Sequence, residues 1–120
     1  MKKQIVKSGI DRLAAVLPDI TGARIGLITN PTGIDKSFRS TIDLLHEQGL
    51  LCCMFSPEHG VRGDLQAGAE VSNYTDSKTN LPVYSLYGHT PHIPQEILDS
   101  FDIVAFDIQD VGARFYTYMY

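Results

Sequence analysis

Three short apolar runs, separated by polar segments, constrain the fold of this 120-residue chain more than any other feature of its sequence. They cover residues 24–29 (RIGLIT), 50–55 (LLCCMF) and 102–108 (DIVAFDI), and polar or turn-forming residues bound them. Apolar runs of this length predict buried β-strands. Apolar residues at helical spacing between the first two of these runs predict a βαβ unit with a right-handed crossover. The alternation predicts an α/β fold, with a mostly parallel sheet and helices on both faces.

Two helices are predicted outside this unit. The first covers residues 8–17, with Ser8 as its N-cap and Pro18 just beyond its end. The second is a short helix over residues 94–100, with Pro94 in its first turn.

The helix between the first two strands is predicted over residues 37–48. Ser37 or Ser40 would cap its N-terminus, and Gly49 is the residue type that commonly follows a helix end. Helical spacing and end signals thus agree for this segment.

A long polar segment follows the second strand. Residues 56–80 contain glycines and little periodicity, apart from one helical turn expected at 64–69. Loops of this length in compact domains are usually functional or disordered. After it, residues 82–87 (PVYSLY) predict a short strand, placed at a sheet edge because Pro82 lacks a backbone N–H.

Composition excludes some classes of function and bears on the extent of the chain. Fourteen acidic and ten basic residues give a net charge of −4, which offers no electrostatic support for binding nucleic acid or an anionic membrane. No segment is long enough to span a bilayer, and the basic start lacks the apolar region of a signal peptide. The aromatic run at 115–120 has no polar tail, so we expect the N-terminal part of a longer protein.

The two cysteines, Cys52 and Cys53, are neighbours within the second predicted strand. Side chains alternate between the faces of a strand, so the two thiols should point to opposite faces and not pair. A buried structural role is favoured over a metal or redox site.

Three polar clusters each follow the end of a predicted strand. They cover residues 30–33 (NPTG), 56–63 (SPEHGVRG) and 107–114 (DIQDVGAR). If the strands are parallel neighbours, all three clusters lie along one edge of the sheet. Ligands of open α/β sheets bind at the carboxyl ends of the strands. This edge is therefore the predicted site.

The second cluster contains three side chains suited to chemistry. A partly desolvated Glu58 would act as a general acid, although the same residue would also serve to close a turn or pair with Arg62. His59 either orients a ligand or is a hydrogen-bonded structural histidine. Arg62 suits a ligand carboxylate, but an internal partner such as Glu70 or Asp110 is the commoner outcome.

The third cluster combines carboxylates, an amide and a guanidinium. Strand alternation places Asp107 and Gln109 on one face. Asp107 and Asp110 would work as paired carboxylates or hold Arg114 in a structural network. Tyr116 would stack on a sugar ring or join the core. No metal-ligand spacing, GxGxxG, P-loop, GxSxG or HExxH motif is present, so neither a metal nor a cofactor is predicted.

The motifs ITNPTG, FSPEHGVRG and FDIQDVGARFYTY, in this order, resemble the exo-β-N-acetylmuramidases of peptidoglycan recycling, the NamZ-type glycoside hydrolases. The resemblance implies a Rossmann-like N-terminal catalytic domain spanning residues 1–120, without the family's smaller C-terminal domain. It implies release of terminal N-acetylmuramic acid from peptidoglycan fragments, and hence an exported protein.

The resemblance also implies roles for individual residues. Glu58 matches the family's proposed catalytic acid, with His59 and Asp107 beside it. The positions expected to bind substrate are Asn30, Arg62, Gln109, Asp110, Arg114 and Tyr116.

Three hypotheses follow from the sequence. The first is a glycosidase in which Asp107 or Asp110 acts as base, as nucleophile or as orienter of the substrate acetamido group. The second is a module that binds muropeptides or sugars without turnover, or an inactive fragment. The third is an interaction domain that associates through its aromatic C-terminus.

Overall fold

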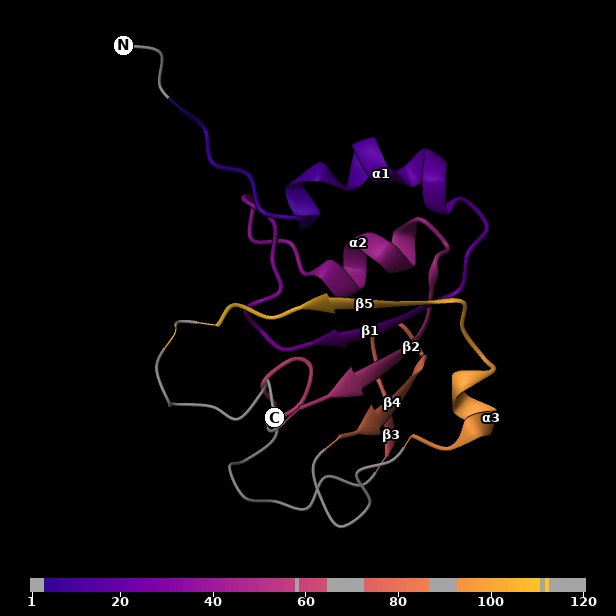
Figure 1. The fold of residues 1–120 in the computed structure, drawn as a ribbon. Helices are drawn as coiled ribbons and strands as arrows, with labels where there is room; N and C mark the ends of the chain where they lie inside the picture. Colours follow the sequence, from indigo (N-terminus) through magenta and orange to yellow (C-terminus); the bar gives the residue numbers. More distant parts are fainter. Residues whose placement is uncertain (1–3, 58, 65–72, 87–92, 111, 113–120) are drawn as a thin grey trace.

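A five-stranded sheet organises the computed structural model, which describes residues 4–57, 59–64, 73–86, 93–110 and 112 (Figure 1). The strands are β1 (Ile25–Thr29), β2 (Leu51–Ser56), β3 (Tyr74–Thr75), β4 (Pro82–Ser85) and β5 (Ile103–Asp107). Their order is β3-β4-β2-β1-β5, and every pairing is parallel except the antiparallel pair of β3 and β4. The predicted α/β fold with a mostly parallel sheet is confirmed.

Helices and aromatic side chains pack against the two faces of this sheet. The helical elements are a 3₁₀ turn (Ile10–Arg12), α1 (Leu13–Ile20), α2 (Thr41–Glu47) and α3 (Gln95–Leu98). The first three lie together on one side of the sheet (Figure 1), where Leu27 and Met54 are fully buried. On the other face Phe101, which follows α3, packs edge-on against Phe55 with ring centroids 5.6 Å apart.

The helix α2 matches its predicted end signals. The Ser40 side chain accepts a hydrogen bond from the Asp43 backbone N–H, which identifies Ser40 as the N-cap. At the other end Gly49 has φ +68°. Its N–H donates to the His46 carbonyl, and the Leu50 N–H donates to the Leu45 carbonyl. These two bonds form a Schellman motif, which satisfies carbonyls at the helix end.

The first predicted helix is displaced along the chain. Helix α1 begins at Leu13 and contains Pro18, which was expected to end it. Ser8 is not an N-cap, because its N–H and hydroxyl both donate to the Asp11 carboxylate. The apolar side chains of α1 pack on the core, and the helix continues two residues past Pro18 to Ile20. That packing compensates for the missing proline N–H.

The sheet edges also differ from expectation. Strand β4 is not an edge strand, because the two-residue β3 pairs with its outer side and Pro82 lies opposite Thr75. Pro82 is the first residue of β4, a position where proline is tolerated. Conversely, β5 was predicted to be buried but lies at the opposite edge, where Val104 and Phe106 remain 51% and 48% exposed.

The cysteine pair shows a further difference. The register between β1 and β2 shifts so that Ile25 pairs with Leu51 and Gly26 with Cys53, leaving Cys52 in a bulge. Because a bulge interrupts side-chain alternation, the two sulfur atoms lie 3.9 Å apart rather than on opposite faces. Both thiols are free, Cys53 is buried, and burial raises its pKa to about 12. The expected structural role suits such a protonated thiol.

Candidate active site

The carboxyl ends of β2, β1 and β5 lie side by side, as the parallel pairing requires. Thr29 at the end of β1 is opposite Asp107 at the end of β5, and Ile28 is opposite Phe55 of β2. The three polar clusters therefore start along one edge of the sheet, as predicted. This placement is the basis of the candidate site.

Side-chain hydrogen bonds join the first and third clusters. The Asn30 side-chain oxygen accepts from the Thr32 N–H and hydroxyl at 2.9 and 2.6 Å, which closes the turn after β1. The Thr32 hydroxyl oxygen in turn accepts from the Gln109 backbone N–H at 2.9 Å. Asn30 is buried, and its side-chain amide oxygen therefore has a role within the turn. Its predicted contact with substrate stays a prediction.

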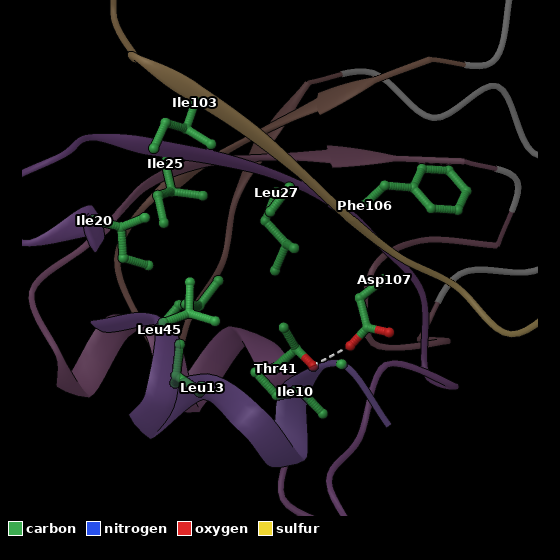
Figure 2. A pocket seen from close by; sticks show the side chains of 13 residues that line it. Ile10, Leu13, Ile20, Ile25, Leu27, Thr41, Leu45, Ile103, Phe106 and Asp107 are labelled. Atoms are coloured by element: carbon green, nitrogen blue, oxygen red, sulfur yellow. Dashed lines mark hydrogen bonds between the residues drawn. The ribbon is translucent and has the colours of Figure 1, made fainter. Parts of the chain in front are cut away.

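Asp107 is held from two sides. Its carboxylate accepts from the Thr41 hydroxyl of α2 at 2.5 Å, and its backbone carbonyl accepts from the buried Thr29 hydroxyl at 2.8 Å. In Figure 2 the Asp107 side chain points toward Thr41, whereas Phe106 points to the other side of β5. The Asp107 carboxylate is therefore oriented before any ligand binds.

Close packing at Gly33 supports this arrangement. A Cβ atom at Gly33 would overlap the Thr29 hydroxyl and lie 2.9 Å from the Asp107 carbonyl oxygen. Only glycine lets the turn after β1 approach the end of β5 so closely.

The second cluster packs against the first and contains strained backbone. A Cβ atom at Gly63 would lie 2.8 Å from the Pro31 ring, so the two loops touch. Val61 is buried in the core. His59 has φ +74°, an uncommon conformation for a residue with a side chain, and Gly60 follows with φ +83°. Such strain persists where surrounding contacts fix the backbone, and it concentrates at functional sites.

Arg62 forms an internal ion-pair cluster. Its Nε and Nη2 atoms donate to the two carboxylate oxygens of Asp76 at 2.6 and 3.0 Å, and Nη2 also donates to Asp43 at 3.1 Å. Lys78 pairs with the other Asp43 oxygen. The expectation of an internal carboxylate partner is confirmed, but the partners are not Asp110, and Glu70 lies outside the described residues. The observed partners come from α2 and the β3–β4 turn.

Hydrogen bonding shifts the pKa values in this cluster. The Arg62 guanidinium, followed by the hydroxyl and N–H of Thr79, holds the pKa of Asp76 well below its usual range. Burial alone would raise the pKa of Asp43, but hydrogen bonds from Lys78 and Arg62 outweigh it and lower that pKa. Hydrogen bonding to Asp76 raises the pKa of Arg62. All three groups are therefore charged at neutral pH.

Two hollows border the site and differ in chemistry. A cavity of about 280 Å³ between α1, α2 and the sheet is apolar except for Thr41 and Asp107 at one end (Figure 2). An open groove of about 570 Å³ lies beside Thr32 and Gln109, with Lys36 on its wall. A saccharide needs many hydrogen-bonding partners, and the open groove, whose lining mixes apolar residues with polar ones such as Asp35, Lys36 and Gln109, offers more of them than the apolar cavity.

The other predicted site residues divide into two groups. The Asp110 carboxylate accepts from the Gly112 N–H at 2.7 Å, which gives one of its oxygens a role in a local turn. Glu58, Arg114 and Tyr116 lie outside the described residues, so their roles stay predictions. Within the described part of the chain no group of three metal-ligating side chains occurs. None of the helices described there is long and apolar enough to cross a membrane.

Sequence reasoning missed several polar residues that contact Arg62 or Asp107. Asp76 and Thr79 have the Asp-x-x-Thr spacing of a side-chain-closed turn, which marks a turn but not its pairing with Arg62. Asp43 and Thr41 lie in the first turn of α2, where a polar residue is ordinary. No local signal indicates that these residues face the loop after β2 or the end of β5.

Comparison with known proteins identifies the family. Residues 25–120 match the family described as exo-beta-N-acetylmuramidase NamZ, N-terminal. The chain belongs to this family. The resemblance inferred from the three motifs is thereby confirmed, as is the expectation of an enzyme family.

Individual relatives agree with this assignment. The peptidoglycan beta-N-acetylmuramidase NamZ of Bacillus subtilis (strain 168) is 55% identical over 125 residues, which cover 99% of this chain and 30% of that protein. Crystal structures of two DUF1343 family proteins from Bacteroides fragilis NCTC 9343 have the same fold. The match to one of them has a TM-score of 0.78 at 48% identity, and it covers 93% of this chain and 28% of the Bacteroides chain. The match to the other has a TM-score of 0.73 at 34% identity, and it covers 97% of this chain and 29% of the Bacteroides chain.

Proposed function

We propose that this chain supplies the acid-bearing N-terminal part of a glycoside hydrolase that releases terminal β-linked N-acetylmuramic acid from peptidoglycan fragments. The observation that supports the proposal most directly is the meeting of all three family motifs at one sheet edge, in a chain 55% identical to a peptidoglycan beta-N-acetylmuramidase. The chain spans 30% of that relative, so the remaining cleft wall would come from the rest of the protein.

In the proposed mechanism Glu58 protonates the glycosidic oxygen as the leaving group departs. A glycosidase of this kind needs a second group, either a carboxylate or the substrate's own acetamido oxygen. Asp107 suits either scheme, because Thr41 fixes one carboxylate oxygen and leaves the other to act as base or to orient the acetamide. Inversion of configuration would indicate a carboxylate base, whereas retention would fit either a carboxylate nucleophile or the substrate's acetamido oxygen. His59 and Gln109 are proposed to line the same cleft.

The lactyl carboxylate of N-acetylmuramic acid calls for a cationic partner. Arg114 of the third cluster is the proposed partner, because a guanidinium binds a carboxylate through two parallel hydrogen bonds. We further propose that the protein is exported, because peptidoglycan lies outside the cytoplasm.

The test is hydrolysis of a chromogenic N-acetylmuramide by the full-length protein and by its Glu58→Gln and Asp107→Asn variants. Asp102→Asn is the control, because Asp102 pairs with Arg24 at the opposite end of the sheet. We expect Glu58→Gln to lower kcat by at least 10²-fold, in line with loss of a general acid. We expect Asp102→Asn to leave it unchanged.

Two results would contradict parts of the proposal. Full activity of Glu58→Gln would remove Glu58 from the role of acid. Saturable binding of N-acetylmuramic acid by the wild-type protein, with no turnover of any muramide, would instead favour a binding module.

A further inference from the structure

We infer that Arg62 is a positioning residue, which Asp76 and Asp43 hold in place, and that it is not the receptor for the substrate's carboxylate. Through Arg62, these two acids would fix the loop that follows Glu58. This inference rests on the proposed glycosidase function. It assigns a task to Asp76 and Asp43 and reassigns one of the expected substrate-binding residues.

The first support is the geometry around Asp76. This residue is only 3% exposed, and its carboxylate accepts four hydrogen bonds, two from Arg62 and two from the N–H and hydroxyl of Thr79. A buried carboxylate satisfied in this way is a fixed anchor for the guanidinium. Arg62 cannot leave it for a ligand without stranding a buried charge.

The second support is the local charge balance. Arg62 lies between the carboxylates of Asp76 and Asp43, and the second Asp43 oxygen binds Lys78. Two cations and two anions sum to zero. A substrate carboxylate arriving here would meet no excess positive charge, and it would be repelled by the acids already paired.

The third support is what the loop requires. His59 and Gly60 both have positive φ, the Val61 N–H approaches the Tyr74 hydroxyl at 3.5 Å, and Gly63 touches Pro31. These contacts act on the backbone at separate points. Arg62 adds a link from the middle of the loop to both α2 and the β3–β4 turn. Strained backbone needs such surrounding contacts to persist.

The experiment compares Asp76→Asn, Arg62→Lys and the double variant in the full-length protein. The matched control is Asp102→Asn, which removes a similar arginine–carboxylate fork at the exposed far end of the sheet. Each protein is assayed with a chromogenic N-acetylmuramide and with the methyl ester of its lactyl carboxylate. Backbone hydrogen exchange of residues 59–63 is measured in parallel.

We expect both single variants to lower kcat by about 10–100-fold, the effect of a small displacement of a catalytic group. KM should change little. The preference for the free acid over the ester should stay at the wild-type ratio, and the double variant should be no worse than the poorer single variant. Exchange of residues 59–63 should quicken in Asp76→Asn and stay unchanged in Asp102→Asn.

Two results would overturn the inference. One is loss of the preference for the free acid in Arg62→Lys, which would make Arg62 the carboxylate receptor. The other is unchanged exchange of residues 59–63 in Asp76→Asn. Exchange does not depend on turnover, so it tests the positioning role even if the wild-type protein hydrolyses no muramide. Arg62→Lys keeps the charge, and it provides the second test if Asp76→Asn does not fold.

Discussion

Gly33 is the position where a single methyl group should disturb the candidate site most. In a Gly33→Ala variant the new Cβ would overlap the Thr29 hydroxyl, and it would lie 2.9 Å from the Asp107 carbonyl oxygen and 3.4 Å from that of Asn30. Two of these neighbours are backbone atoms, and Thr29 is itself buried. Moving the Thr29 hydroxyl or the Asp107 carbonyl breaks the hydrogen bond that joins the ends of β1 and β5.

The expected loss of stability has two parts. Forcing a methyl group into a packed region typically costs about 1–3 kcal/mol. Displacing the Thr29 hydroxyl also breaks its 2.8 Å hydrogen bond to the Asp107 carbonyl, and leaving a buried polar group unpaired costs about 1–3 kcal/mol. The free energy of unfolding should therefore fall by about 2–6 kcal/mol, a range set by how far the turn relaxes.

Urea unfolding of Gly33→Ala, Thr29→Ala and the double variant measures this cost. Gly9→Ala is the control, because Gly9 has φ −56° and a Cβ there meets nothing within 4 Å. The double variant should lose less unfolding free energy than the sum of the two single variants, because Thr29→Ala removes the hydroxyl that the new Cβ would overlap. A Gly33→Ala protein as stable as Gly9→Ala would refute the packing argument. So would losses that simply add in the double variant.

Two further predictions concern the loops and the helix of the site. Because the Asp76 pKa is lowered in the folded state, its contribution to stability is present above the unfolded-state pKa of 3.8 and is lost as the pH falls below it. Urea unfolding at pH 5, 4 and 3 should therefore show a steeper fall for wild type than for Asp76→Asn, by up to about 1.4 kcal/mol per pH unit; parallel curves would contradict this. Ser40→Ala should lower the unfolding free energy by about 1 kcal/mol, because the Asp43 N–H loses its acceptor; an unchanged urea midpoint would argue against the cap.

The parts of the fold that the sequence predicted are those governed by local pattern. Apolar runs located β1 and β2 to within one residue at each end. Helix α2 was recognised because Ser40 and Gly49 supply its end signals directly. The meeting of the three clusters followed from parallel topology alone, since it depends on which ends of the strands are neighbours and not on side-chain detail.

The parts that the sequence could not predict depend on contacts between distant segments. The two residues of β3 have no periodicity of their own and form a strand only by pairing with β4. The bulge at Cys52 arises from the register between β1 and β2, which alternation within one strand does not encode. Asp76 pairs with a residue 14 positions away, and nothing near it in sequence indicates that partner.

The described side chains of the three motifs suggest why matching the motifs locates the site more securely than it assigns roles. The side-chain amide oxygen of Asn30 closes the turn after β1, and one carboxylate oxygen of Asp107 accepts from Thr41. Arg62 is paired with Asp76 and Asp43. Each of these residues could be required for activity because it holds a neighbouring loop, without touching substrate. Loss of activity on substitution therefore cannot by itself identify a catalytic residue here. Substrate preference and hydrogen exchange of the loop must be measured together with kcat. Only a residue that touches the substrate changes the substrate preference without changing the exchange of the loop.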